Sequence, residues 1–229
     1  FLQESGKTVD KPVRAMREYA QALQRLWTGE AVHIAGDFVQ LAGARLAFKP
    51  SARIPIYIAA IGPDMLKLAG RIGDGVALSA GLSTDSVRAS LALCAEGAAK
   101  DGRDMRTFRR ASYIFFGTSR DGRAAIDAVR QKLAFVMRNK FLGANIKASG
   151  IPVDQEAVIA AIARRDIAGA AALVPDEAVE AFGIAGTPQH CAKRLQDFID
   201  AGIDEPVLGI LGSAENCRLA LDVMREFAA

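Results

Sequence analysis

The pattern of apolar and polar positions divides this chain into short apolar runs and longer stretches with helical spacing. The runs are continuous rather than alternating, which indicates strands buried on both faces, as in a parallel sheet covered by helices. The expected strands are 55–60, 74–80, 111–117 and 206–211. The expected helices are 12–28, 63–72, 84–100, 121–138, 188–201 and 215–228. The loosely alternating segment 31–49 predicts a short hairpin or an irregular loop.

Each of these four strands is followed by a helix, and this order predicts an α/β fold with four βα units. Four units make about half of a (β/α)8 barrel of the TIM type, so we expect the C-terminal half of such a barrel. A doubly wound open sheet is the competing architecture, which periodicity does not separate from the barrel. We expect a single domain over 1–229. Within it, the helical pieces of 140–183, broken by Gly and Pro, are expected to form an insertion.

Composition places the chain among globular α/β proteins and narrows its partners. Of its 229 residues 51% are hydrophobic and 24% charged, and the formal net charge is only +3. The densest basic cluster, 103–110, has no interleaved stacking aromatics, so we expect a solvated connection and no nucleic-acid partner. No apolar run approaches the length of a membrane span, and no signal peptide opens the chain. Because the first residue is Phe1, we expect the N-terminus to be a truncation point.

The cysteines argue for a reducing compartment and against a metal site. Cys94, Cys191 and Cys217 are far apart, form no CxxC pair and lie in helix-like apolar stretches. We therefore expect a cytoplasmic protein without disulfides and without a bound metal.

The segment Ile54–Gly81 holds the first candidate site, because function in such folds collects where parallel strands end. The strand at 55–60 ends in Ala60-Ile61-Gly62, and Pro63 opens the next helix. Glycine relaxes the steric limits on the turn, and proline leaves the following N–H groups free to bind a phosphate near Met65. The plain alternative is a tight strand-to-helix turn. Asp64 would repel a phosphate unless its side chain points to solvent.

Three other candidate motifs have simpler structural interpretations. His190 follows a Thr187 cap and is expected to be a surface histidine without a carboxylate partner, and His33 lies in the loose segment 31–49. The segment 117–124 has P-loop glycine spacing but lacks the required Lys and hydroxyl, so Thr118, Ser119 and Arg120 are expected at a helix cap with a solvent arginine. Ser213 is expected to cap the last helix.

Three segments resemble the luciferase-like oxidoreductases: PIYIAAIGPDMLKLAGRIGDGV from Pro55, REYAQALQRLWTGEAVHIAGDFVQL from Arg17 and GIAGTPQHCAKRLQDFIDAGIDEPVLGI from Gly183. With the order of elements between them, the resemblance covers nearly the whole chain. It implies a (β/α) barrel enzyme that uses FMN or the deazaflavin coenzyme F-420, as in methylene-tetrahydromethanopterin reductases. It also implies two groups of cofactor-binding residues. The phosphate is held at the end of the first strand, by Ala60, Ile61, Gly62, Pro63 and Met65. The same pocket is lined at the end of the next strand by Ser79 and Gly81.

The resemblance implies an oxidoreductase acting on a small-molecule substrate. With FMN the reaction is oxygenation of a paired donor with reduction of molecular oxygen, and with F-420 it is hydride transfer without oxygen. No catalytic residue can be assigned, because the family draws many of them from the first half of the barrel. The alternative is a non-catalytic half-barrel module for binding or assembly, and exposed strand edges predict a homo-oligomer.

Overall fold

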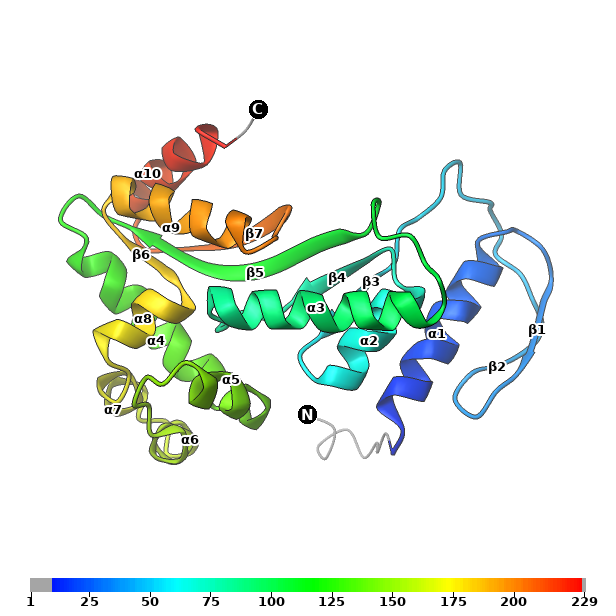
Figure 1. Cartoon of the computed structure of the whole chain (residues 1–229), viewed down its shortest axis with the longest axis horizontal. Coiled ribbons are helices and arrows are strands. Elements are labelled where there is room, and N and C mark those ends of the chain that lie inside the picture. The colour runs from blue at the N-terminus through cyan, green and yellow to red at the C-terminus, as the bar shows by residue number, and fades with distance from the viewer. Residues whose placement is uncertain (1–9, 228–229) are drawn as a thin grey trace.

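A computed structural model describes residues 10–227 and contains a five-stranded, fully parallel sheet (Figure 1). Its strands are β3 (Tyr57–Ala60), β4 (Gly75–Leu78), β5 (Arg109–Thr118), β6 (Ile184–Gly186) and β7 (Glu205–Leu211). The ten-residue β5 is the centre of the sheet. Its first half pairs with β4, its last residues pair with β6, and β7 runs along it from Ala111 to Gly117.

The four expected strands are confirmed, but the count of four βα units is wrong. The fifth parallel strand, β6, lies between the helices of 140–183 and the helix that begins at Pro188. Its Ile184, Ala185 and Gly186 are all buried beside Phe116, Gly117 and Thr118 of β5. A strand of three residues is too short to show a period, which is why the sequence pattern did not reveal it.

The helices follow the expected pattern closely. The helices outside the region between α4 and β6 are α1 (Pro12–Leu26), α2 (Pro63–Ile72), α3 (Thr84–Lys100), α4 (Arg123–Met137), α9 (Pro188–Asp200) and α10 (Ala214–Arg225). The region between α4 and β6 contains η1 (Lys140–Leu142), α5 (Gly143–Ala148), α6 (Gln155–Ala163), α7 (Ile167–Ala172) and α8 (Asp176–Phe182). The segment 31–49 forms the antiparallel hairpin of β1 (Val32–Ala35) and β2 (Gln40–Ala44).

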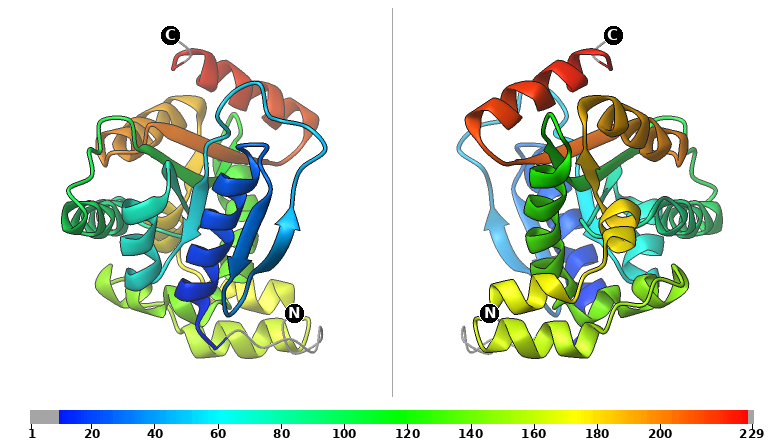
Figure 2. Two further views of the ribbon diagram at one scale, coloured as in Figure 1. Left: turned by 90° about the vertical axis from the view of Figure 1, so that its right-hand side faces the viewer. Right: turned by 90° about the vertical axis from the view of Figure 1, so that its left-hand side faces the viewer.

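The two ends of the sheet carry different structures. In Figure 1, β5 runs from right to left, so the carboxyl ends of the strands lie toward the left, near α4 and α8. The views of Figure 2 show α1 with the β1–β2 hairpin at one end and α4 to α8 at the other. The hairpin therefore lies away from the end where function collects in parallel sheets.

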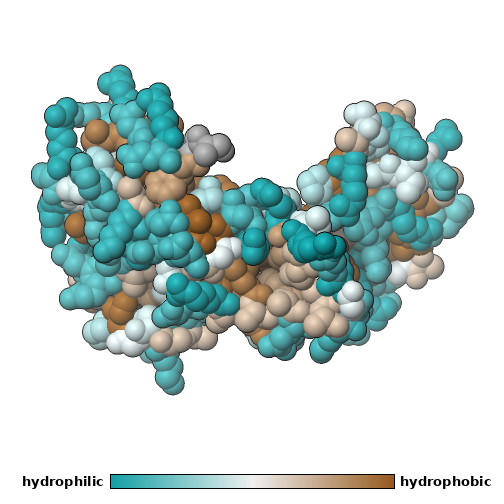
Figure 3. Space-filling view, turned by 45° about the horizontal axis from the view of Figure 1, so that its top comes forward, coloured by the Kyte–Doolittle hydropathy of each residue, from teal (hydrophilic) through white to brown (hydrophobic). Residues whose placement is uncertain are grey.

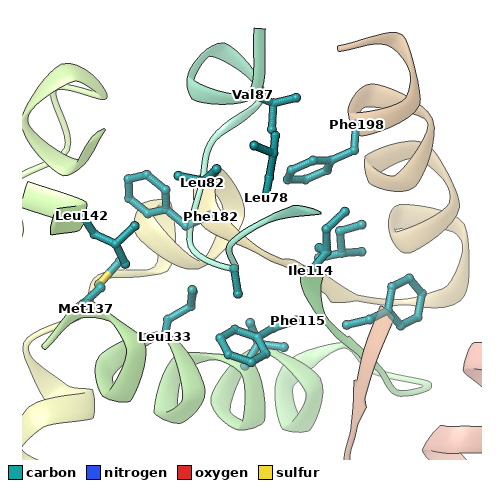
Figure 4. Packing of buried hydrophobic residues seen from close by; sticks show 14 of the residues in the cluster. Leu78, Leu82, Val87, Ile114, Phe115, Leu133, Met137, Leu142, Phe182 and Phe198 are labelled. Carbon is teal, nitrogen blue, oxygen red and sulfur yellow. The ribbon is translucent and has the colours of Figure 1, made fainter. Parts of the chain in front are cut away.

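One hydrophobic core joins the sheet to the helices on both sides of β5. Figure 4 shows side chains of β4, β5, α4, α8 and α9 converging on it. Phe116, Phe182 and Phe198 are among its largest fully buried members. The region 140–183 thus contributes to the same core as the sheet, through Leu142, Val158 and Phe182.

One face of the sheet is only partly covered. The register places Ala59, Ala77, Tyr113 and Val207 on the same face, and Tyr113 and Val207 are 44% and 50% exposed. Tyr113 reaches across to β7, where a Cβ at Gly209 would lie 2.4 Å from its hydroxyl. Figure 3 shows the molecule hollowed between its two ends, with hydrophobic residues among the polar ones. We call the surface formed by Ala59, Ala77, Tyr113 and Val207 the open sheet face.

The three cysteines are free thiols. Burial raises the pKa of Cys94 to about 12 and that of Cys191 to about 11. The Cys191 thiol donates to the Gly117 carbonyl at 3.2 Å. Both thiols are therefore protonated near neutral pH and behave as small core residues.

Candidate cofactor site

The predicted cofactor residues come from two neighbouring parallel strands. Ala60, the last residue of β3, pairs in register with Leu78, the last residue of β4. Ile61 and Gly62 therefore leave the sheet beside Ser79, at the same edge. The structure thus brings the two predicted groups of residues together at the carboxyl ends of their strands.

The start of α2 has backbone N–H groups without a side-chain cap. Gly62 is the N-cap residue, Pro63 occupies the first turn, and no side chain accepts a hydrogen bond there. The helices α3, α9 and α10 differ, because Ser83, Thr187 and Ser213 cap them. The uncapped N–H groups at Asp64 and Met65 and the helix dipole favour an anion at this position.

Gly62 is not required for its backbone freedom. Its φ of −80° and ψ of 152° are extended values that any residue adopts, so the expected relief of steric limits is wrong. A Cβ placed on Gly62 would find no heavy atom within 4 Å. The space in front of the α2 start is therefore open to a ligand.

The other residues of this turn divide between the core and the solvent. Ala60 is buried, and the partly buried Ile61 and Met65 pack against the core. Asp64 is exposed, so its carboxylate can point to solvent and leave room for a phosphate at the backbone. Only backbone groups of this turn are thus offered to a ligand.

Ser79 and Gly81 differ in their access to a ligand. Ser79 is partly exposed next to the β3 end. Gly81 is buried with a φ of +83°, and a Cβ there would lie 3.2 Å from Val136 Cγ1 and 3.4 Å from Leu142 Cδ1. Glycine at this position permits both the left-handed turn and the close packing of α4 and η1, which explains the residue without a ligand.

The structure places the remaining candidates as follows. His33 lies in the hairpin, at the opposite end of the sheet from the β5 carboxyl end (Figure 1). Arg120 is solvent-exposed and paired with Glu215 at 2.8 Å, as expected. The N-cap position of α4 is Gly122, in a left-handed conformation, and the side chains of Asp121 and Ser119 accept hydrogen bonds from the first turn, from the Arg123 N–H at 3.2 Å and the Ala125 N–H at 3.4 Å. Thr118 is buried at the end of β5. Ser213 caps α10 as predicted.

His190 is more than the surface histidine that the sequence suggested. Its Nε2 lies 2.8 Å from Glu180 Oε2, so the expectation of no carboxylate partner is wrong. Glu180 is in α8 and His190 in the first turns of α9, and β6 separates the two helices. Because the pattern does not predict β6, no local signal places these two residues together.

No group of three or more His, Cys, Asp or Glu side chains that could hold a metal ion occurs among residues 10–227. Within the same range, none of the helices is long and apolar enough to cross a membrane. The candidate site is built from backbone groups and small side chains at the strand ends. Such a site fits the phosphate of an organic cofactor, because free N–H groups and open space are what a phosphate needs.

The fold and this site define a parallel α/β protein with an uncapped helix start after the first strand of its parallel sheet. The sequence profile of the luciferase-like monooxygenase family matches residues 2–205. The chain belongs to that family.

Two kinds of relatives, methylenetetrahydromethanopterin reductases and F420-dependent glucose-6-phosphate dehydrogenases, are similar to most of this chain. A 5,10-methylenetetrahydromethanopterin reductase of Archaeoglobus fulgidus is 33% identical over 212 residues, covering 91% of this chain and 63% of its own length. An F420-dependent glucose-6-phosphate dehydrogenase of Nocardia farcinica is 28% identical, covering 84% of this chain and 53% of its own length. The chain thus spans less than two thirds of these relatives.

The solved structures agree on the fold. The coenzyme F420 dependent tetrahydromethanopterin reductase from Methanopyrus kandleri superimposes with a TM-score of 0.78 at 27% identity, covering 93% of this chain and 62% of that protein. An EDTA monooxygenase from Chelativorans sp. BNC1 has a TM-score of 0.62 at 16% identity, which shows a shared fold alone.

Proposed function

We propose that this chain is the cofactor-phosphate part of an oxidoreductase that binds a deazaflavin, with FMN as the other candidate cofactor. The observation that carries the proposal is the uncapped α2 start with open space at Gly62, in a chain of this family. The names of the relatives favour the deazaflavin, because those of the Nocardia and Methanopyrus proteins specify F420.

In this proposal the N–H groups at Asp64 and Met65 hold the phosphate, and Gly62 allows it to approach the backbone. Ala60, Ile61 and Pro63 fix the turn by packing and by the conformation of proline, and Ser79 lines the pocket from the next strand. Gly81 stabilises the loop that follows β4, because it allows this loop to pack closely against Val136 and Leu142. The cofactor, when bound, supplies hydride transfer in the deazaflavin case and oxygen chemistry in the FMN case.

The chain's own contribution is binding, orientation and exclusion of water. The helices between α4 and β6 pack over the carboxyl end of the sheet, where Leu142 and Phe182 are buried in the common core. The substrate is proposed to be a small molecule bound on that side. A loss of cofactor affinity in Gly62→Val is the result that this function predicts.

We also propose that β3, β4, β5 and β7 are four consecutive strands of an eight-stranded barrel. Two features support this. Within residues 10–227, β3 and β7 are each paired along one edge only, and the open sheet face exposes Tyr113 and Val207. Both features are typical of a sheet whose inner face and edges need further strands.

The open sheet face also supports the alternative function, a module that assembles with a second copy. We expect this chain to form a concentration-dependent dimer in sedimentation velocity, because an exposed apolar face and free strand edges favour pairing. Val207→Lys should shift the population to monomer by placing a charge on that face. Leu221→Lys in α10 removes an equally exposed apolar side chain away from the face and should leave the dimer intact. A monomer at every concentration would contradict the assembly proposal.

We propose a cytoplasmic location because the cysteines are thiols and not disulfides. All three are free, and Cys94 and Cys191 are buried in the core, so the fold does not rely on disulfides. Such usage fits a reducing compartment.

A further inference from the structure

A cavity of about 1100 Å³ lies outside the predicted cofactor residues. Its walls are the first turns of α3 and of α4, the end of α5 with the residues that follow, α8, and the β6–α9 turn, which lie together on the left side of Figure 1. None of the seven predicted cofactor residues lines it. Its volume lies slightly above the usual range for small-molecule sites, which is roughly 300–1000 Å³.

The floor of the cavity is apolar. It is formed by side chains from four separate elements: Ile126, Ile151, Val179, Ala181 and Ala185. Val179 and Ala185 are also members of the core cluster, so this floor is fixed by the packing of the fold. A preformed apolar surface of this kind favours the body of an organic ligand over an ion.

One wall of the cavity carries a polar cluster of Glu180, His190 and Arg194. Glu180 Oε2 lies 2.8 Å from His190 Nε2, and Glu180 Oε1 lies 3.3 Å from Arg194 Nε. Arg194 also donates from Nη2 to the Glu180 carbonyl at 2.8 Å. A Cβ at Gly186 would lie 2.8 Å from His190 Cδ2, so the imidazole is seated against that glycine. The cluster therefore presents a positioned imidazole to the cavity.

The charges that line the cavity are compensated within the protein. Asp85 pairs with Arg88 at 2.8 Å, and Glu180 pairs with His190 and Arg194. Arg130 pairs with Asp176 and holds the pKa of that carboxyl below its ordinary value.

The last two carboxylates are also accounted for. Asp121 accepts hydrogen bonds from Ser119 Oγ and the Arg123 N–H. Glu177 is exposed in the first turn of α8, where water screens its charge and the helix dipole offsets it. The cavity thus offers hydrogen-bonding groups and no buried uncompensated charge.

We propose that this cavity is a second ligand site that binds an uncharged amphipathic organic molecule. The apolar body lies on the Ile126–Val179–Ala185 floor, and a hydroxyl or amide end meets the His190 and Thr187 wall. A charged ligand is disfavoured because it would gain no free counter-charge and would lose water. The site goes beyond the proposed cofactor function, since it uses none of the residues of the phosphate turn.

The experiment is a fluorescence titration of the protein with Nile red, a neutral amphipathic dye. Two filling variants from different helices, Ala148→Trp in α5 and Ala89→Trp in α3, add an indole to the cavity lining and should each weaken binding by about tenfold or more. Ala172→Trp in α7 is the matched control, because this exposed alanine does not line the cavity. It should bind the dye as the parent protein does. Thermal unfolding of all three variants checks that each is folded.

Two further measurements separate this site from the open sheet face and from a charged-ligand site. Val207→Asp changes the open sheet face and should leave the dye affinity unchanged. Affinity should also be insensitive to salt, because no ion pair with the ligand is involved. The proposal is overturned if Val207→Asp abolishes binding while both filling variants retain it. It is equally overturned if only the anionic dye anilinonaphthalene sulfonate binds the cavity, with salt-sensitive affinity.

Discussion

Replacing Gly70 by alanine is expected to destabilise the protein strongly, although alanine is the better helix former. A Cβ at Gly70 would lie 1.8 Å from the carbonyl oxygen of Cys94, and one at Gly97 would lie 2.0 Å from that of Lys67. These two glycines let α2 and α3 cross with their backbones in contact. The clashing atoms are backbone atoms, so a side-chain rotation cannot relieve the overlap and the helices must move apart.

The cost of that movement is estimated from overpacked cores. We expect Gly70→Ala to lower the free energy of unfolding by about 3 kcal/mol, against a gain of about 1 kcal/mol from helix propensity alone. For a domain of this size that is a fall in Tm of roughly 6–12 °C. Thermal unfolding followed by circular dichroism measures it. Gly62→Ala is the matched control, since its backbone is extended and its Cβ meets nothing, so only the modest N-cap preference for glycine is lost and its Tm should stay within a few degrees of the parent value. Equal Tm values for the two variants would contradict the close crossing of α2 and α3.

Replacing Gly62 by valine is expected to cost cofactor affinity and not stability. The extended backbone of Gly62 accepts a β-branched residue, and its surroundings have room for one. The same room is where we place the cofactor phosphate, so the two valine methyl groups would occupy it. We expect a loss of about tenfold or more in affinity for coenzyme F-420 in Gly62→Val, and a smaller loss in Gly62→Ala.

The affinity is measured by titration of the cofactor absorbance or fluorescence, with FMN titrated in parallel. Because both Gly62 variants should keep the parent Tm, a loss of affinity reports on the site. If Gly62→Val binds as tightly as the parent protein, the phosphate does not approach the α2 start. A substitution at Gly81 would not serve as this test, because any side chain there would strain a left-handed turn and crowd Val136.

Local signals in the sequence predicted much of the fold. The bounds of α2 and α3 follow from Pro63 and Gly73 around one helix and from the Ser83 cap of the other, and the structure agrees to the residue. The Thr187 and Ser213 caps were predictable for the same reason, because a cap is a relation between residues three positions apart. The strands of the sheet were predictable because continuous apolar runs of four or more residues leave few other choices.

Relations between distant residues were not predictable. The short β6 has no period of its own and exists because it completes the edge of β5 at Gly117 and Thr118. The Glu180–His190 pair depends on β6, and the cavity beside it depends on four elements packing together. The sequence pattern indicates that Gly62 relaxes the turn, whereas its observed φ of −80° is one that any residue adopts.

The central claim, that the α2 start holds the cofactor phosphate, is tested most directly by amide NMR. The ¹H–¹⁵N spectrum of the protein is recorded while coenzyme F-420 is added. The account predicts that the largest shifts occur at the amides of Gly62, Asp64 and Met65, with smaller shifts at Ser79. Shifts confined to Ser86, Thr187 and His190, with the α2 start unchanged, would contradict it and place the cofactor in the cavity beside α8.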